Sequence, residues 1–295
     1  MTFYILDVFG NKRYSGNQLA VFMDSGRLNE TEMQQIAREI NFSETTFITS
    51  PDKTNGGYPV RIFTPGSEVA FAGHPTLGTA YILQKYIENG QSNSVSLNLK
   101  AGQIPVTTTG DLLWMKQNQP EFGDTVDADM MASMLKLKPG DINTRFPVQE
   151  VSTGLHFLIV PLTSLDAVKR SGINHEIYWK FIENSRAKGI LVFSTEGREK
   201  GHGISSRVYV DYYGIPEDPA TGSATGCLAA YLVNYSVFGS TQIEVTAGQG
   251  YEMGRPSELY IRAEKKHDEY DIFVGGKVFE VASGIWNANN NQHTL

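Results

Sequence analysis

The chain of 295 residues is long enough for one large domain or for two domains of ordinary size. Its 25 basic and 32 acidic residues leave a net charge of −7, which argues against a nucleic-acid-binding face. The single cysteine, Cys227, excludes an internal disulfide and the paired-cysteine spacings of metal-binding modules.

Short segments that alternate in polarity, or that are rich in β-branched and aromatic residues, predict strands along the whole chain. Gly275 and Gly276 stand between the last two segments and predict a hairpin turn there. The predicted strands are Phe3–Val8, Ala20–Met23, Thr46–Thr49, Val60–Thr64, Val95–Leu99, Gln103–Thr108, Leu112–Lys116, Val148–Ser152, His156–Val160, Gly189–Phe193, Ser205–Asp211, Gln242–Val245, Glu258–Ala263, Tyr270–Gly275 and Lys277–Ser283.

Apolar residues at spacings of three and four predict five helices between these strands. Two helical stretches, Pro75–Ile82 and Ser223–Val233, contain no charged residue. A helix without a polar face is buried on most sides, so each should lie at the centre of a group of strands. The predicted helices run from the N-cap Asn29 to Ile40, Pro75–Ile87, Ala128–Leu137, Glu176–Ala187 and Ser223–Asn234.

Two short segments half a chain apart resemble each other. They align when Gly73 is matched with Gly222, an offset of 149 residues, and an arginine-containing strand precedes each copy, at Arg61 and Arg207. The pattern of each copy predicts a strand, a glycine-containing turn and a helix, in that order. The repeat predicts a mixed α/β fold of two related halves, each a set of strands around a central helix. The two helix N-termini would face one cleft, where their N–H groups favour a small anion.

Glu44 is the first candidate for acid–base chemistry. It lies between Phe42 and Phe47, just before a predicted strand. Apolar surroundings would raise the pKa of its carboxyl group toward neutrality, which suits a group that takes and returns a proton. The alternative interpretation is a solvated glutamate in a turn, and the local sequence alone favours that alternative.

His74 lies before Pro75 at the start of the first uncharged helix. The N–H groups of Gly73 and His74 would point off this helix end toward a carboxylate, and the imidazole would hold or relay a proton. The alternative is a histidine that caps or packs locally.

Asp218 and Ser223 are the candidates beside the second uncharged helix. Asp218 would orient an amine or hydroxyl group of a substrate, and Ser223 would lie where the N–H groups of Gly222 and its neighbours face the cleft. The alternatives are a turn aspartate before Pro219 and an ordinary N-cap serine.

Other common sites are excluded by spacing. The glycine-rich segment Gly222–Gly226 has neither the Lys-Ser/Thr of a P-loop nor the GxGxxG pattern, and the chain has no GxSxG motif. The first residues do not resemble a signal peptide and no apolar run is long enough to span a bilayer, so we expect a cytoplasmic protein. The polar tail Asn287–Leu295 is expected to fray.

Three segments, in this order, resemble the signature segments of the PhzF family of phenazine-biosynthesis proteins. They are Ser43–Phe47, Phe71–Ala80 and Glu217–Ser223. The first residues and the last predicted strand are also similar, so the resemblance covers nearly the whole chain. One departure is Gln18, which follows Gly-Asn where the family commonly has proline.

The resemblance implies the diaminopimelate epimerase fold, with two pseudo-symmetric halves, each a β-barrel-like sheet around a central helix. The segment Gln117–Asp124 is the predicted crossing between the halves. We therefore expect one half-domain from residues 1–117 plus about 279–295 and a second from residues 118–278, with the active site in the cleft between them.

The resemblance also implies an isomerase that moves a proton within a small carboxylate-bearing substrate. Glu44 matches the glutamate that shuttles the proton, while His74 and Asp218 match residues that hold and polarise the substrate. Ser223 matches a serine near the substrate. The N–H groups at Gly73–His74 and Gly222–Ser223 match the carboxylate cradle. The resemblance implies a homodimer and implies no metal or organic cofactor.

Two other functions stay open at this point. An amino-acid-type epimerase of this fold would use one cysteine from each half, but His74 and Ser223 occupy those positions. A non-catalytic protein that binds a small anion, or a scaffold, would not need the combination of Glu44, His74 and Asp218. The natural substrate does not follow from the sequence.

Overall fold

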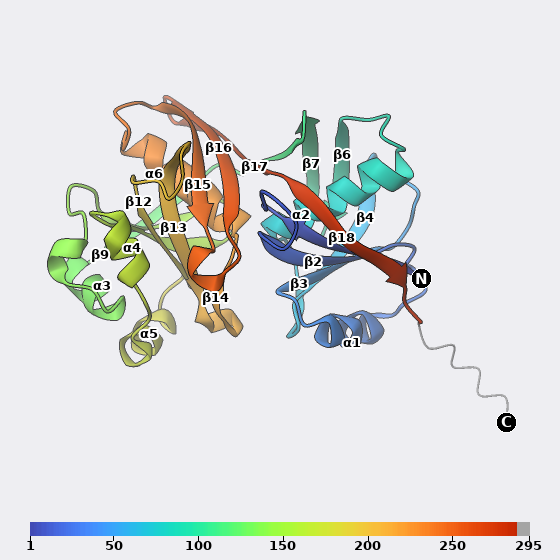
Figure 1. Cartoon of the computed structure of the whole chain (residues 1–295), viewed down its shortest axis with the longest axis horizontal. Coiled ribbons are helices and arrows are strands. Elements are labelled where there is room, and N and C mark those ends of the chain that lie inside the picture. Colours follow the sequence, from blue (N-terminus) through green and yellow to red (C-terminus); the bar gives the residue numbers. More distant parts are fainter. Residues whose placement is uncertain (288–295) are drawn as a thin grey trace.

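The computed structural model describes residues 1–287, so nearly all of the predicted polar tail Asn287–Leu295 lies outside the described residues. The chain forms the predicted mixed α/β fold, with strands around two central helices, α2 (Gly73–Ile82) and α6 (Gly222–Asn234). The two helices lie in different lobes of the molecule (Figure 1). Within residues 1–287, no helix is both long and apolar enough to cross a membrane.

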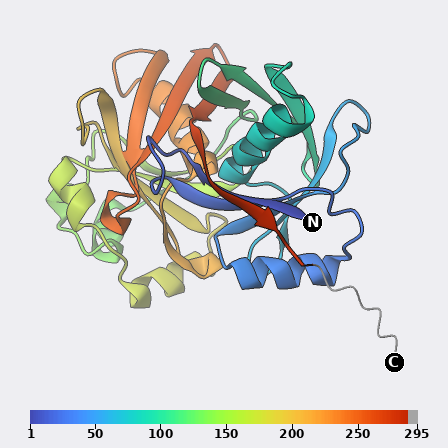
Figure 2. The same cartoon turned by 45° about the vertical axis from the view of Figure 1, so that its right-hand side comes forward.

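The first lobe surrounds α2. In it, β2 pairs with β1 in antiparallel and with β3 in parallel orientation, and β4 connects this group to β6 and the following hairpins. Helix α1 (Glu30–Ile40) covers the outer face, as Figure 2 shows, and begins in a capping box between Asn29 and Glu32. The strands are β1 (Thr2–Val8), β2 (Asn17–Phe22), β3 (Glu44–Ile48), β4 (Tyr58–Phe63), β5 (Glu68–Val69), β6 (Ser94–Leu99), β7 (Gly102–Thr109), β8 (Leu112–Lys116) and β18 (Val278–Ile285).

The second lobe surrounds α6. Its outer face is covered by α3 (Ala128–Met134), α4 (Leu165–Arg170) and α5 (His175–Ile182), which form a separate apolar cluster with the strands beneath them. The strands are β9 (Glu121–Val126), β10 (Val148–Ser152), β11 (His156–Pro161), β12 (Gly189–Ser194), β13 (His202–Val210), β14 (Ile215–Asp218), β15 (Gln242–Gln249), β16 (Ser257–Lys266) and β17 (Glu269–Gly276).

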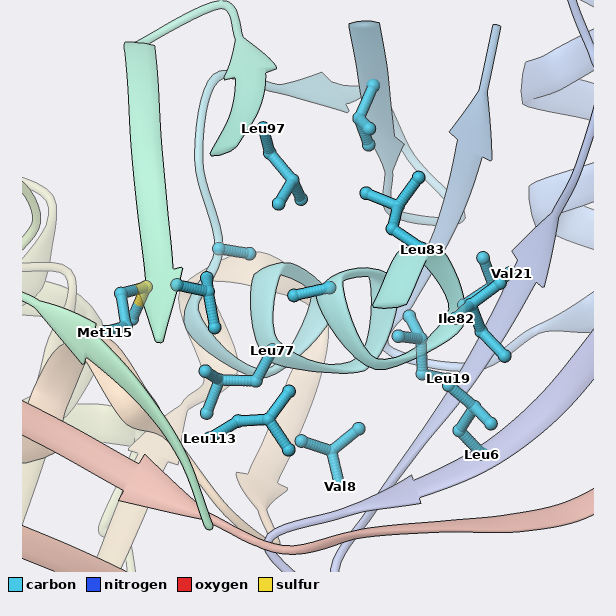
Figure 3. Close-up of a cluster of buried hydrophobic side chains, with 14 of the residues drawn as sticks. Leu6, Val8, Leu19, Val21, Leu77, Ile82, Leu83, Leu97, Leu113 and Met115 are labelled. Carbon is cyan, nitrogen blue, oxygen red and sulfur yellow. The ribbon is translucent and has the colours of Figure 1, made fainter. Parts of the chain in front are cut away.

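Both uncharged helices are buried, as their composition predicts. Every residue of α6 from Gly222 to Val233 is buried, and Tyr81 is the one residue of α2 that is not. Figure 3 shows side chains of the surrounding strands converging on α2. Burying one such aliphatic side chain contributes roughly 1.5–3 kcal/mol, so these helices hold the lobes together. The labelled residues are Leu6, Val8, Leu19, Val21, Leu77, Ile82, Leu83, Leu97, Leu113 and Met115.

The predicted hairpin turn at Gly275 and Gly276 is wrong. Both residues belong to β17, which pairs with β16 and with β8, while β18 pairs with β1. Both glycines are packed too tightly for a side chain: a Cβ atom on Gly275 would lie 2.6 Å from the Trp114 ring, and one on Gly276 2.3 Å from Phe9. These residues therefore carry the chain from one lobe to the other.

The repeat extends to an ion pair in each lobe. Arg61 donates through Nε to Glu68 at 2.7 Å, and Arg207 donates through Nε to Glu217 at 2.9 Å. Each pair lies between the strand that precedes the glycine turn and the short strand that leads into it. We propose half-domains that follow this repeat, residues 1–117 plus those from about 279, and residues 118–278.

Several predicted boundaries differ from the structure. Regular α-helix begins at Gly73 rather than Pro75 and ends at Ile82, where the π-helical turn Leu83–Ile87 follows. The predicted crossing Gln117–Asp124 contains the start of β9, which pairs with β10. The strands β5 and β14 had no prediction because they have only two and four residues, too few to show a periodic pattern. The strand β9 and the helix α4, with six residues each, were also not predicted.

Candidate active site

All six predicted site residues line one cavity of about 350 Å³ between the lobes. Its walls come from both copies of the repeat and from the start of β3. Most of the remaining lining is apolar, which is typical of a small-molecule site with a few polar groups that fix the ligand's orientation. The predicted residues are Glu44, Gly73, His74, Asp218, Gly222 and Ser223.

The N-termini of α2 and α6 meet at this cavity. A Cβ atom on Gly73 would lie 3.0 Å from Cα of Gly222 and 3.1 Å from the backbone nitrogen of Ser223. The N-cap residues, Ala72 and Thr221, make no side-chain capping hydrogen bond, and neither first turn contains an acidic residue. The N–H groups in the first turns of α2 and α6 therefore point toward the same cavity.

Glu44 enters the cavity from the first position of β3, opposite Leu19 of β2. Its side chain is 17% exposed, and its Oε2 atom has no hydrogen-bond partner within the described residues. Burial, and next the nearby charge of Asp218, raise the pKa of this carboxyl group to about 8. The carboxyl group is therefore mostly protonated at neutral pH. Its apolar surroundings are not the predicted ones, because Phe42 and Phe47 pack in the cluster beneath α1 and do not line the cavity.

His74 lies in the first turn of α2 with a side chain only 5% exposed. Its Nε2 atom is 3.4 Å from Oε2 of Glu44, and it too has no hydrogen-bond partner in residues 1–287. Burial lowers the pKa of the imidazole to about 3, against a smaller opposing effect of a hydrogen bond with the Gln18 backbone. At neutral pH, a neutral imidazole thus faces a protonated carboxyl group.

The raised pKa of Glu44 predicts a pH-dependent cost to folding. The unfolded chain loses this proton near pH 4.5 and the folded chain near pH 8, so stability falls as the pH rises through this range. Glu44→Gln does not titrate. The free energy of unfolding of Glu44→Gln minus that of the wild type is the quantity compared. We expect this difference to be larger at pH 9 than at pH 4 by at least about 1 kcal/mol. Urea unfolding at both pH values measures this, and an equal difference at both would contradict the raised pKa.

Asp218 lies at the end of β14 and is held by residues of both lobes. Asn17 donates to its Oδ1 atom at 2.8 Å, and the Thr221 hydroxyl group donates to Oδ2. Burial raises the pKa of Asp218 to about 6, although these two hydrogen bonds act in the opposite direction. Asp218 is therefore mostly ionised at neutral pH, unlike Glu44.

Asn17 and Gln249 are site residues that the sequence analysis did not identify. Asn17 also donates to the Ala220 carbonyl group at 3.0 Å, and Gln249 donates to the Asp218 carbonyl group at 2.8 Å. Neither lines the cavity, and each acts by positioning Asp218 and the turn before α6. The pair Gly16-Asn17 near the start of the chain, which resembles the family, was the signal for Asn17, while no pattern marked Gln249.

Asn17→Ala is expected to destabilise the protein by about 1–3 kcal/mol, because two buried acceptors lose their donor. Loss of this hydrogen bond should also raise the pKa of Asp218 further. The control is Asn98→Ala, which removes an asparagine that donates to two backbone carbonyl groups in a more exposed hairpin. Urea unfolding of both variants measures the loss of stability, and activity measured between pH 5 and 8 tests the change in the pKa of Asp218. An unchanged pH profile in Asn17→Ala would show that Asn17 does not position Asp218.

Ser223 is not the N-cap of α6, which was the alternative interpretation of this residue. The helix begins at Gly222 with Thr221 as N-cap, so Ser223 lies in the first turn, and it lines the cavity. Cys227, one turn further along, is fully buried in the apolar core. Burial raises the pKa of its thiol group to about 12, which leaves it unsuited to proton transfer near neutral pH.

A desolvated carboxyl group beside an imidazole, in a mostly apolar cavity between two matched helix N-termini, is typical of the active site of an enzyme. The family model described as phenazine biosynthesis-like protein (PhzC-PhzF) matches residues 6–284. The chain therefore belongs to the PhzF family. It is an isomerase, as are the relatives whose names include that word.

Known relatives resemble the chain over nearly its full length. It is 34% identical to the trans-2,3-dihydro-3-hydroxyanthranilate isomerase of Pseudomonas chlororaphis, over 90% of this chain and 92% of the relative. It is 31% identical to an uncharacterized isomerase of Clostridium acetobutylicum, over 94% and 95%.

Solved structures agree with this assignment. The crystal structure of a PhzF-family protein from Bacillus anthracis matches with a TM-score of 0.87 at 28% identity, covering 96% of this chain and 98% of that one. A probable proline racemase from Agrobacterium radiobacter matches with a TM-score of 0.63 at 10% identity, over 99% and 94%, which shows a shared fold alone.

Proposed function

We propose that this isomerase moves a proton between two atoms of a small carboxylate substrate, with Glu44 as the proton carrier and without a metal or organic cofactor. The observation that carries the proposal is the pair of Glu44 Oε2 and His74 Nε2, which lie 3.4 Å apart without hydrogen-bond partners in the described chain. Buried polar atoms are nearly always partnered, so this pair is best explained by a ligand that completes it.

The substrate carboxylate would bind where α2 and α6 meet. Their N–H groups at Gly73–His74 and Gly222–Ser223 are free of side-chain caps, and glycine at the start of each helix lets a ligand approach the backbone closely. No lysine or arginine side chain is needed to hold the anion, because the helix dipoles supply the positive potential.

Asp218 would accept a hydrogen bond from an amine or hydroxyl group of the substrate. Each of its carboxylate oxygens already accepts one hydrogen bond, from Asn17 or from Thr221, and each has a further lone pair. The ionised Asp218 would thus fix the orientation of the substrate, while the neutral imidazole of His74 would hold the carboxyl group of Glu44 in position.

Glu44 would carry the proton from one substrate atom to the other and end in the protonation state in which it began. A carboxyl group with a pKa of about 8 suits this role, since both of its protonation states are accessible near neutral pH. The related Pseudomonas enzymes are named for trans-2,3-dihydro-3-hydroxyanthranilate, which makes that amino acid the first candidate substrate. Its carboxylate and amino groups are the two groups that the proposed site would bind.

The test is incubation of the protein with trans-2,3-dihydro-3-hydroxyanthranilate and then with a panel of small carboxylates, in deuterated water containing a chelator. We expect deuterium to enter a new carbon position of one of them, as detected by NMR. Deuterium at an existing stereocentre with loss of optical rotation would instead show an epimerase. The absence of both an isomerised product and deuterium exchange with every compound would favour a binding protein. The cytoplasmic location and the homodimer stay predictions.

A further inference from the structure

We propose that Glu199, His202 and Glu258 form a binding site for one divalent transition-metal ion, separate from the catalytic cavity. Glu199 lies in the turn before β13, His202 is the first residue of β13, and Glu258 is the second residue of β16. None of the three lines the cavity that contains Glu44. The ion would therefore have a structural role, and the cofactor-free proton transfer proposed above does not depend on it.

The three side chains converge on one point. One ligand atom of each lies within 4.8 Å of the others, and Nε2 of His202 is 3.5 Å from Oε1 of Glu258. Ligand atoms about 2.0–2.1 Å from a tetrahedral Zn²⁺ are about 3.4 Å apart, so the His202–Glu258 separation already fits. A shift of about 1 Å in the more exposed Glu199 side chain would complete a set of three ligands, with water as the fourth.

The His202 ring is held in one orientation, with Nε2 toward the carboxylates. Its side chain is 5% exposed, and its Nδ1 atom, which faces the β15 backbone rather than the proposed ion, has no hydrogen-bond partner within residues 1–287. A Cβ atom on Gly248 would lie 2.8 Å from Nδ1, so the ring packs directly on the β15 backbone and is fixed in orientation. Its other nitrogen faces the carboxylates at a distance too long for a good hydrogen bond.

The two carboxylates lack a neutralising cation. Among the described residues, Glu199 and Glu258 form no ion pair with lysine or arginine, whereas the neighbouring Glu252 pairs with Arg198. Their hydrogen bonds come from neutral tyrosine hydroxyl groups. Tyr251 donates to Glu199 at 2.8 Å and Tyr260 donates to Glu258 at 3.0 Å. Hydrogen bonds of this kind orient metal-ligating carboxylates and leave their charge available to the ion.

The proposed site borders the surface, and an ion there would join two strands. His202 lines a surface hollow of about 410 Å³ beside β15 and β16, and the carboxylate of the exposed Glu199 is reached from solvent. The ion would tie the start of β13 to the start of β16, where the Glu258 N–H group donates to the Phe9 carbonyl group of the other lobe. Imidazole with carboxylate oxygens suits Zn²⁺ or Mn²⁺ better than Mg²⁺ or Ca²⁺.

The experiment is calorimetric titration of the full chain, freed of metal by a chelator and dialysis, with ZnCl₂. We expect one Zn²⁺ ion per chain and a rise in the thermal unfolding temperature. Glu199→Gln and Glu258→Gln should each weaken binding at least about tenfold and lose the temperature rise. Glu199 is exposed, so its variant is expected to fold even if the other does not.

The matched control is His175→Asn, which removes an exposed histidine that pairs with Asp211 and has no third ligand among the described residues. It should bind Zn²⁺ as the wild type does. Equal binding by the wild type and Glu199→Gln, or absence of a one-to-one complex in the wild type at micromolar Zn²⁺, would overturn the proposal. A loss of binding in His175→Asn would also overturn it, by placing the ion elsewhere.

Discussion

Glu44→Gln is expected to lower turnover by at least about 100-fold once a substrate is known, with a much smaller change in KM. Glutamine has nearly the same shape and still forms hydrogen bonds, but it does not carry a proton between two atoms of the substrate. General acid–base groups typically contribute 10²–10⁴-fold, which sets the scale of the loss. The measurement is the initial rate of deuterium incorporation in deuterated water, together with kcat and KM.

The control for this variant is Glu39→Gln, an exposed glutamate of α1 far from the cavity lining. It should keep the wild-type rate. Full turnover in Glu44→Gln would show that another group carries the proton, and the proposed mechanism would then be wrong even though the family assignment would stand.

Gly73→Ala is expected to reduce both stability and activity. The added Cβ atom would lie 3.0 Å from Cα of Gly222 and 3.1 Å from the backbone nitrogen of Ser223. These are backbone atoms of a buried helix, so relief requires the two helix N-termini to move apart. We expect a loss of about 1–3 kcal/mol in the free energy of unfolding, as for other overpacked cores. Displacement of the N–H groups should lower kcat/KM at least about tenfold.

The matched control is Gly140→Ala, because a Cβ atom there meets no atom within 4 Å and the backbone is not in the left-handed region. Its unfolding free energy should change by no more than about 0.5 kcal/mol. Urea unfolding and steady-state kinetics are measured for both variants. Wild-type kcat/KM in Gly73→Ala would mean that the close approach of α2 and α6 does not serve the site.

Local patterns were most informative where burial is nearly complete. The two helices were predicted as central because neither contains a charged residue, and the structure buries both almost fully. The repeat likewise predicted that their N-termini would meet, and Gly73 and Gly222 are in contact. Burial of Glu44 was one of two interpretations of its position between Phe42 and Phe47. The structure buries Glu44, but in a cavity that neither phenylalanine lines.

Predictions failed where pairing partners are distant in the chain. Gly275 and Gly276 match the sequence of a hairpin turn, but β17 and β18 do not pair with each other there. β17 pairs with β8 and β18 pairs with β1, so the chain passes from one lobe to the other at this point. Glycine is required there by the approach of Trp114 and Phe9. Asn17 and Gln249 were not predicted for the same reason. Both donate hydrogen bonds to Asp218, which lies about 200 residues from Asn17 and about 30 residues from Gln249 in the sequence.

The sequence by itself determined the family, the two central helices and the set of polar residues that could do chemistry, because these depend on residue type and local order. The tertiary structure alone decided that Glu44 and His74 face each other without a hydrogen-bond partner among residues 1–287, and that Asp218 is held across the lobes by Asn17. The physical reason is desolvation: the pKa of a carboxyl group depends on all the atoms that exclude water from it, and those atoms come from both halves of the chain.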